Sequence, residues 1–141
     1  MIDKDGHACL MDYGLSSIYL ALWSHEPFSE MLRWSAPEII GSTTKPVVRG
    51  SKEADVFAFG MVMVEVFSCN VPFFEKDLVA TALSITEKER PSKPEELTEG
   101  LWNLTQQCWE EDPCKRPTME VVVEKLQEPV GDDGESVPLG K

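Results

Sequence analysis

A nearly continuous apolar segment constrains the fold more than any other feature of the sequence. Residues 56–67 read VFAFGMVMVEVF, with Glu65 as the single charged residue. We expect a helix that starts at Ser51–Asp55, where acidic residues suit the positive end of the helix dipole. A helix that is apolar on nearly every face must be surrounded by other elements. Because the run is shorter than the ~20 residues of a membrane span, it predicts a buried central helix.

Three shorter helical patterns follow this segment. The first spans residues 78–83, and the second carries Trp102 and Trp109 one heptad apart. Thr118 is expected to be the N-cap of the third. The positions expected to face the core are Leu101, Leu104 and Cys108 in the second helix, and Val122, Val123 and Leu126 in the third.

The N-terminal part of the chain lacks helical spacing. Asp5-Gly6 predicts a tight turn between two short strands, residues 1–2 and 7–11, because glycine accepts a positive φ. Residues 15–50 show no sustained period, and ordered loops of such length are usually functional. The fold is therefore expected to be mainly α, with a short β-hairpin, a long loop and about four helices around the central one. Residues 128–141 combine proline, glycine and acids, which predicts a disordered acidic tail.

Composition excludes several classes of function. The formal charge of -12 and a pI of about 4.5 disfavour binding to nucleic acid or to an anionic membrane. The four cysteines form no Cys-x-x-Cys pair, so a zinc site is not expected. No secretory signal opens the sequence, which indicates a reducing cytoplasm or nucleus, with cytoplasm as our expectation, and cysteines that are buried as small apolar residues.

Four short motifs occur in a fixed order. Asp12-Tyr13-Gly14 follows the second expected strand, and by itself it fits an ordinary turn as well as a metal ligand. Ala36-Pro37-Glu38 comes next, and Asp55 then opens the apolar helix. Cys108-Trp109 and Asp112-Pro113 precede Arg116-Pro117-Thr118. Each motif alone is weak, but their order and spacing together are specific.

This combination resembles the C-terminal lobe of a eukaryotic protein kinase, from the strand after the catalytic loop to the last helix. Residues 33–38, Arg-Trp-Ser-Ala-Pro-Glu, and the Cys-Trp…Arg-Pro-Thr ending are most similar to the tyrosine-kinase-like group. The resemblance implies a partial kinase domain over residues 1–127. It also implies that residues 12–38 form the activation segment, with Tyr13, Gly14, Ala36, Pro37 and Glu38 as its motif residues.

The resemblance also implies roles for single residues. Asp12 matches the aspartate that binds the magnesium bridging the β- and γ-phosphates of ATP. Ser24 or Ser29 could accept a phosphate in the activation segment, but the interpretation of both as simple solvent-facing loop serines is favoured. Tyr13 replaces the usual phenylalanine and keeps its aromatic body.

Two further positions match scaffold residues of the family. Glu38 and Arg116 match an ion pair between the end of the activation segment and the turn before the last helix, a place that suits a bidentate arginine. The alternative is two unrelated surface charges. Asp55 matches the residue that holds the catalytic-loop backbone, and the alternative is an acid favoured by a helix N-terminus.

Other kinase motifs do not occur in this sequence. It contains no Gly-x-Gly-x-x-Gly, no Val-Ala-x-Lys and no His-Arg-Asp. ATP and magnesium are implied by the family, but we expect this chain alone not to bind them. The chain is then one of two things. It is either a part of a serine/threonine protein kinase that acts on a protein substrate, or a non-catalytic module or pseudokinase remnant that binds a protein partner. Serine/threonine specificity is favoured because Met31-Leu32 lacks the proline that many tyrosine kinases carry nearby.

In the family, another helix packs beside the central one. That helix precedes the catalytic loop in the sequence, so it is not part of the segment that this chain matches. We therefore expect an exposed apolar helix surface that favours self-association.

Overall fold

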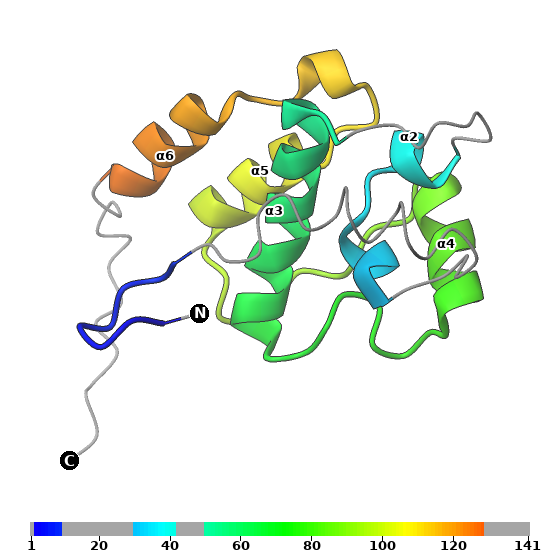
Figure 1. Cartoon of the computed structure of the whole chain (residues 1–141), viewed down its shortest axis with the longest axis horizontal. Coiled ribbons are helices and arrows are strands. Elements are labelled where there is room, and N and C mark those ends of the chain that lie inside the picture. The colour runs from blue at the N-terminus through cyan, green and yellow to red at the C-terminus, as the bar shows by residue number, and fades with distance from the viewer. Residues whose placement is uncertain (1, 10–29, 42–49, 129–141) are drawn as a thin grey trace.

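The computed structural model describes residues 2–9, 30–41 and 50–128, and the statements below concern these residues. Helices dominate them, so the expected mainly helical fold is confirmed (Figure 1). In chain order the elements are η1 (Glu30–Trp34), α2 (Pro37–Ile40), α3 (Lys52–Ser68), α4 (Leu78–Thr86), α5 (Glu99–Cys108), η2 (Pro113–Lys115) and α6 (Met119–Gln127).

The apolar run forms α3, and α3 lies at the centre of the fold as expected (Figure 1). Ser51 is its N-cap, with Oγ accepting a hydrogen bond from the backbone N–H of Ala54 at 3.1 Å. Phe57 and Met61 are fully buried. The helix ends at Cys69, whose φ of +54° is in the left-handed region that often closes a helix.

α5 packs closely against α3 at Gly60. A Cβ atom at this position would lie 3.1 Å from the Cβ of Cys108 and 3.4 Å from the carbonyl oxygen of Thr105. Glycine therefore allows the two helices to approach more closely than a larger residue would.

Buried side chains form two clusters around α3. Phe57, Met61 and Ile85 belong to the larger one, together with Trp109, whose ring meets Trp102 edge-on at a centroid distance of 5.4 Å. The smaller cluster joins α3, α5 and α6 through Val56, Leu104, Cys108 and Val122. The heptad spacing of the two tryptophans thus corresponds to a direct contact.

The N-terminal hairpin was expected to contain two strands, and this is wrong for the described part of it. The turn is present, with Gly6 at a φ of +87°. Residues 2–9, however, form only one isolated antiparallel bridge, between Ile2 and Ala8. A single bridge forms no extended ladder, and two-stranded pairs are marginal without further strands or packing.

Two expectations about burial are corrected. Val122 is buried in α6, but Val123 and Leu126 are exposed, because this short helix packs mainly against α5 and buries a narrow stripe. Among the cysteines that the structure describes, only Cys108 is buried; Cys9 and Cys69 are exposed outside the helices, and Cys114 is exposed in η2. Burial raises the pKa of the Cys108 thiol to about 11, so it stays protonated at neutral pH.

None of the helices in residues 2–9, 30–41 and 50–128 has the length and apolar character that a membrane-crossing segment needs.

Candidate functional site

Arg116 lies at the centre of the best-defined polar cluster. Its side chain is 0% exposed, and Nη1 and Nη2 donate hydrogen bonds to Oε1 and Oε2 of Glu38 at 2.6 and 2.9 Å. Glu38 is in α2, whereas Arg116 directly follows η2, so the pair joins segments 78 residues apart in sequence. The contact that the sequence predicted between these residues is present, with the bidentate geometry that a guanidinium favours.

Backbone carbonyl groups complete the surroundings of Arg116. Nε donates to the oxygen of Glu110 at 2.8 Å, and Nη1 donates to the oxygen of Glu53 at 2.9 Å. The guanidinium carbon also lies 5.0 Å from the centre of the Phe57 ring. Arg116 therefore connects α2, the start of α3 and the turn before η2 through one buried cation.

A second arginine contacts the same aromatic ring. The guanidinium carbon of Arg90 lies 5.1 Å from the centre of Phe57, and its Nη2 donates to Oε2 of Glu111 at 3.0 Å. Nη1 donates to the carbonyl oxygen of Ile85 at 3.1 Å. Burial lowers the pKa of Arg90, and the Glu111 carboxylate opposes that shift. Each arginine of the cluster thus has its own carboxylate.

The ionisation of Glu38 is set by two opposing effects. Burial acts to raise its pKa, but the hydrogen bonds and charge of Arg116, together with the helix backbone, outweigh burial and hold the pKa below its usual value. Glu38 is therefore ionised at neutral pH and matches the positive charge of Arg116.

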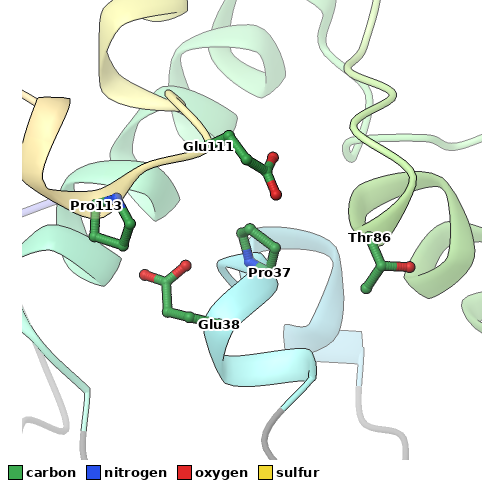
Figure 2. A pocket seen from close by; sticks show the side chains of 5 residues that line it. All are labelled: Pro37, Glu38, Thr86, Glu111 and Pro113. Atoms are coloured by element: carbon green, nitrogen blue, oxygen red, sulfur yellow. The ribbon is translucent and has the colours of Figure 1, made fainter.

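A surface pocket of about 330 Å³ lies beside these ion pairs. Glu38 and Pro37 of α2, Thr86 of α4, Glu111 and Pro113 line it (Figure 2). Neither arginine is among the lining residues, and each of the two lining carboxylates is paired with one of the arginines.

Arg33 is a second buried anchor, and sequence reasoning did not single it out. Nη1 donates to the carbonyl oxygens of Pro72 and Phe73 at 3.1 and 2.8 Å, and Nη2 donates to that of Lys76 at 2.9 Å. The hydroxyl of Thr81 is a further acceptor at 3.3 Å. These bonds fix η1 against the loop that leads into α4. Carbonyl acceptors leave no signature in a sequence, and the only available signal was the position of Arg33 before Trp34.

Trp34 explains the one charge in the apolar run. Its indole Nε1 donates a hydrogen bond to Oε2 of Glu65 at 2.9 Å. Indole N–H groups usually find a partner when the ring is partly buried. Glu65 thus attaches η1 to α3 and does not interrupt the helix.

The remaining predicted residues are not brought into this cluster. Asp55 is exposed in the first turn of α3, and its carboxylate has no hydrogen-bond partner within the described ranges. Asp12, Tyr13 and Gly14 lie outside the described residues, as do Ser24 and Ser29.

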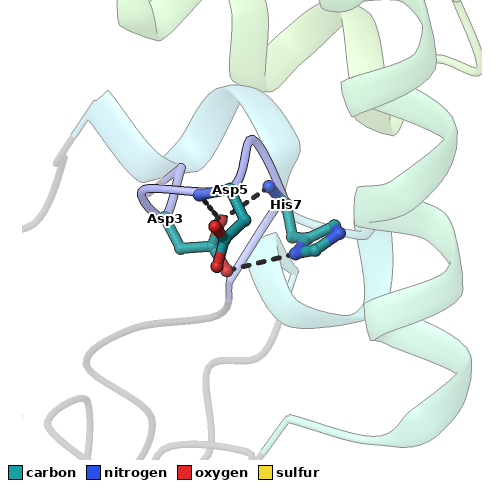
Figure 3. Close-up of side chains that lie close together, drawn as sticks. All are labelled: Asp3, Asp5 and His7. Atoms are coloured by element: carbon teal, nitrogen blue, oxygen red, sulfur yellow. Dashed lines mark hydrogen bonds and ion pairs between the residues drawn. The ribbon is translucent and has the colours of Figure 1, made fainter.

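Asp3, Asp5 and His7 form an exposed group near the N-terminus, and their possible ligand atoms lie within 4.8 Å of one another (Figure 3). Oδ1 of Asp3 accepts the backbone N–H groups of Asp5 and His7 at 2.9 and 2.8 Å, and Oδ2 lies 3.3 Å from Nδ1 of His7. The backbone hydrogen bond from His7 is the main cause that lowers the pKa of Asp3. The turn itself therefore accounts for the proximity of these groups.

The family profile described as protein tyrosine and serine/threonine kinase matches residues 1–126. Similar curated proteins include serine/threonine/tyrosine-protein kinase HT1 of Arabidopsis thaliana, with 36% identity over 90% of this chain and 32% of that protein. Serine/threonine-protein kinase 12 of Arabidopsis thaliana is 29% identical over 89% of this chain and 27% of its own length.

A viral relative extends the comparison beyond plants. The serine/threonine-protein kinase/receptor R818 of Acanthamoeba polyphaga mimivirus is 34% identical over 93% of this chain, but over only 8% of its own length. The chain thus spans less than a third of each of the three relatives. The profile match covers most of the sequence, and the ion pair expected from the kinase motifs is formed. The chain belongs to the protein tyrosine and serine/threonine kinase family.

Proposed function

We propose that this chain supplies the substrate-side helical scaffold of a serine/threonine protein kinase of the tyrosine-kinase-like group. The observation that carries the proposal is the bidentate contact between Glu38 and Arg116, formed by residues that occupy matching motif positions. The names of the relatives, which include serine/threonine-protein kinases, support this specificity.

The reaction of the whole kinase would transfer the γ-phosphoryl group of ATP to a serine or threonine hydroxyl of a protein, leaving ADP. Kinases of this family generally use ATP with magnesium, and Asp12 is the residue of this chain that we assign as a magnesium ligand. A carboxylate suits that role because magnesium prefers hard oxygen ligands. We assign magnesium binding to the complete kinase site, of which Asp12 is one ligand, and not to Asp12 alone.

The described residues would act by positioning. Arg116 fixes Glu38, and with it the end of the proposed activation segment, residues 12–38, against α3. Arg33 fixes η1 of the same segment against the loop before α4. Two arginines thus hold the same segment at two points, which is the kind of pre-organisation that phosphoryl transfer depends on. Asp55 is assigned to the support of the catalytic-loop backbone.

We further propose that this chain alone neither transfers phosphate nor binds ATP–magnesium tightly. Its sequence has no glycine-rich phosphate loop and no His-Arg-Asp motif, and charge stabilisation in kinases comes from both lobes. Calorimetric titration of the purified chain with ATP and magnesium should show no micromolar binding. A radiolabel assay on a generic protein substrate should show no transfer.

Asp12→Ala is the matched variant for this test, and Asp5→Ala on the exposed turn is its control. Micromolar binding of ATP–magnesium that is lost in Asp12→Ala and kept in Asp5→Ala would overturn the proposal. The same titration with a longer chain that includes the missing motifs should show binding, which separates a kinase part from a pseudokinase remnant.

A non-catalytic binding module is the second candidate, and the exposed face of α3 favours it. Val62 and Val66 are one turn apart on the helix and 39% and 63% exposed, as the expected apolar surface requires. We propose that this face mediates self-association of the isolated chain. Sedimentation at increasing concentration should show dimers that Val66→Ser weakens and Val123→Ser on α6 leaves unchanged.

The remaining assignments are proposals of the same kind. We assign residues 1–127 to the partial kinase domain, residues 128–141 to a disordered acidic tail, and the protein to the cytoplasm, with a protein substrate or partner.

A further inference from the structure

The turn between α3 and α4 contains a bulky, buried residue with a left-handed backbone. Phe73 has a φ of +55° and is 3% exposed. Among the described residues, Cys69 and Lys88 are the other two non-glycine residues with a positive φ, and both are exposed. A left-handed backbone brings the Cβ of an L-residue too close to the following carbonyl oxygen. The turn is therefore strained, and it persists only because its surroundings hold it.

Arg33 binds the strained part of this turn. Its Nη1 donates to the carbonyl oxygens of both Pro72 and Phe73, and its Nη2 donates to that of Lys76. The left-handed backbone at Phe73 brings the first two of these carbonyl groups to a single nitrogen atom. The oxygen of Phe73 also accepts the backbone N–H of Lys76 at 2.9 Å, so both of its lone pairs are used. Hydrogen bonding to Arg33 thus stabilises the strained conformation of the turn.

The same turn is attached to α4. Nζ of Lys76 donates to Oγ of Ser84 in α4 at 2.8 Å and pairs with Oε1 of Glu89 at 2.5 Å. The next residue, Asp77, is the N-cap of α4, and its Oδ1 accepts the backbone N–H of Ala80 at 2.8 Å. A change in the backbone of the turn must therefore move the residues that fix the start of α4.

We propose that residues 72–76 form a strained latch that Arg33 closes. With Arg33 bound, Phe73 keeps its left-handed conformation and α4 begins at its present position. When η1 withdraws Arg33, the turn relaxes to a negative φ at Phe73 and the first turn of α4 shifts. The position of η1 is thereby coupled to the position of α4.

Burial of the Phe73 ring is the competing explanation for the strained backbone. The ring belongs to the larger core cluster, together with Met61 and Ile85. A ring can keep its place in a core by rotating about its side-chain bonds. The carbonyl groups of the turn, in contrast, can meet one guanidinium only if the backbone itself turns, so these contacts depend directly on φ. The latch requires no nucleotide, so it goes beyond the proposed kinase function and stands or falls separately from it.

NMR of the full chain labelled with ¹⁵N and ¹³C tests the latch while the Phe73 ring stays in place. In the parent, the three-bond coupling between the amide and α protons and a strong intraresidue NOE between them should report a positive φ at Phe73. Arg33→Met should change both to the values of a negative φ and should shift the amide signals of residues 76–81. Glu30→Gln leaves the guanidinium in place and should change neither.

A second measurement compares glycine with alanine at position 73 by urea unfolding. Both substitutions remove the ring, but only alanine keeps the Cβ that a left-handed backbone disfavours. In the parent background, the unfolding equilibrium constant of Phe73→Gly should be about two- to fivefold smaller than that of Phe73→Ala. In the Arg33→Met background the order should reverse, since at a negative φ glycine loses more conformational freedom on folding than alanine does.

Lys88 supplies the matched control for this comparison. Its φ is +68°, its side chain is exposed, and it follows the C-terminal end of α4, away from the turn. Lys88→Gly should be more stable than Lys88→Ala by the same factor with Arg33 present and with Arg33→Met.

Three results would overturn the latch. A φ at Phe73 that stays positive in Arg33→Met would show that packing of the ring alone holds the turn. An equal preference for glycine at position 73 in both backgrounds would show that Arg33 does not control the strain. Signal shifts confined to η1, with residues 76–81 unchanged, would show that the turn does not couple η1 to α4.

The test does not depend on every variant folding. If the Phe73 variants do not fold, the NMR comparison decides, because it keeps the ring. If Arg33→Met does not fold, Arg33→Lys replaces it, since a lysine keeps the charge but lacks the planar fork that reaches several carbonyl groups at once. The same change in the sign of φ at Phe73 is then expected, and an unchanged positive φ contradicts the latch.

Discussion

Arg33 and Arg116 are both buried, but they differ in what accepts their hydrogen bonds. Arg116 binds the carboxylate of Glu38 with both terminal nitrogens. Arg33 donates mainly to backbone carbonyl groups, and its one carboxylate partner among the described residues, Glu30, lies at 3.3 Å with a largely exposed side chain. One anchor therefore depends on the ionisation of a partner, and the other depends mostly on the path of the backbone.

This difference predicts how each anchor responds to a change in pH and to substitution. A carboxylate can be protonated or substituted, whereas a carbonyl oxygen can be neither. Removing Arg116 leaves an unpaired, partly buried carboxylate, while removing Arg33 leaves unsatisfied carbonyl groups without net charge. The comparison can be tested with three measurements.

The largest effect is expected for Arg116→Ala. Loss of one partner of a buried ion pair costs about 3–5 kcal/mol of unfolding free energy, because the other charge is left unmatched. Lys115→Ala, at the neighbouring exposed position, should stay within about 0.5 kcal/mol of the parent. Urea unfolding monitored by tryptophan fluorescence measures both. Equal losses in the two variants would show that Arg116 is not an anchor.

A smaller loss is expected for Arg33→Met, which keeps much of the side-chain volume. The carbonyl oxygens of Pro72, Phe73 and Lys76 lose their donor, and unsatisfied buried groups cost roughly 1–3 kcal/mol. Glu30→Gln should change stability little, since this carboxylate is exposed and contributes one long contact. If Glu30→Gln lowered the unfolding free energy as much as Arg33→Met, Arg33 would depend on an ion pair, as Arg116 does, and the two anchors would not differ.

The smallest effect concerns pH. The folded pKa of Glu38 is lowered, so its stabilising contribution is present above the unfolded pKa of about 4.3 and is lost as the pH falls through the lower folded value. The loss should be on the order of 1 kcal/mol for this partly exposed carboxylate. Glu38→Gln should flatten the acid limb of the stability curve, while Arg33→Met should leave its shape unchanged. An acid limb that is identical in the parent and in Glu38→Gln would contradict this.

The same contrast explains which parts of the site could be predicted from sequence. The contact between Glu38 and Arg116 was predictable because both partners are side chains at motif positions. Arg33 was not, because its acceptors are mostly carbonyl groups, which every residue carries. The sequence shows Glu65 only as the single charge in an apolar helix, and the structure shows that it accepts a hydrogen bond from Trp34.

Predictions about the fold succeeded where a local rule acts alone. Thr118 caps its helix as expected, because a capping hydroxyl needs only the next turn of the backbone. Val123 and Leu126 were assigned to the core wrongly, since burial depends on how many neighbours a helix has and not on its own pattern. Within residues 2–9 the expected strand pair is reduced to one bridge for a related reason, because pairing needs more than a good turn.

The close approach of α3 and α5 at Gly60 has a consequence for substitution in this kinase chain. The space between the helices is shared by positions 60 and 108, because the nearest atom to an added Cβ is the Cβ of Cys108. A methyl group gained at position 60 must therefore be matched by volume lost at position 108, or the helices must separate. Gly60→Ala combined with Cys108→Gly exchanges which helix carries the side chain while keeping the distance between their axes. The two positions behave as one packing unit divided between two helices.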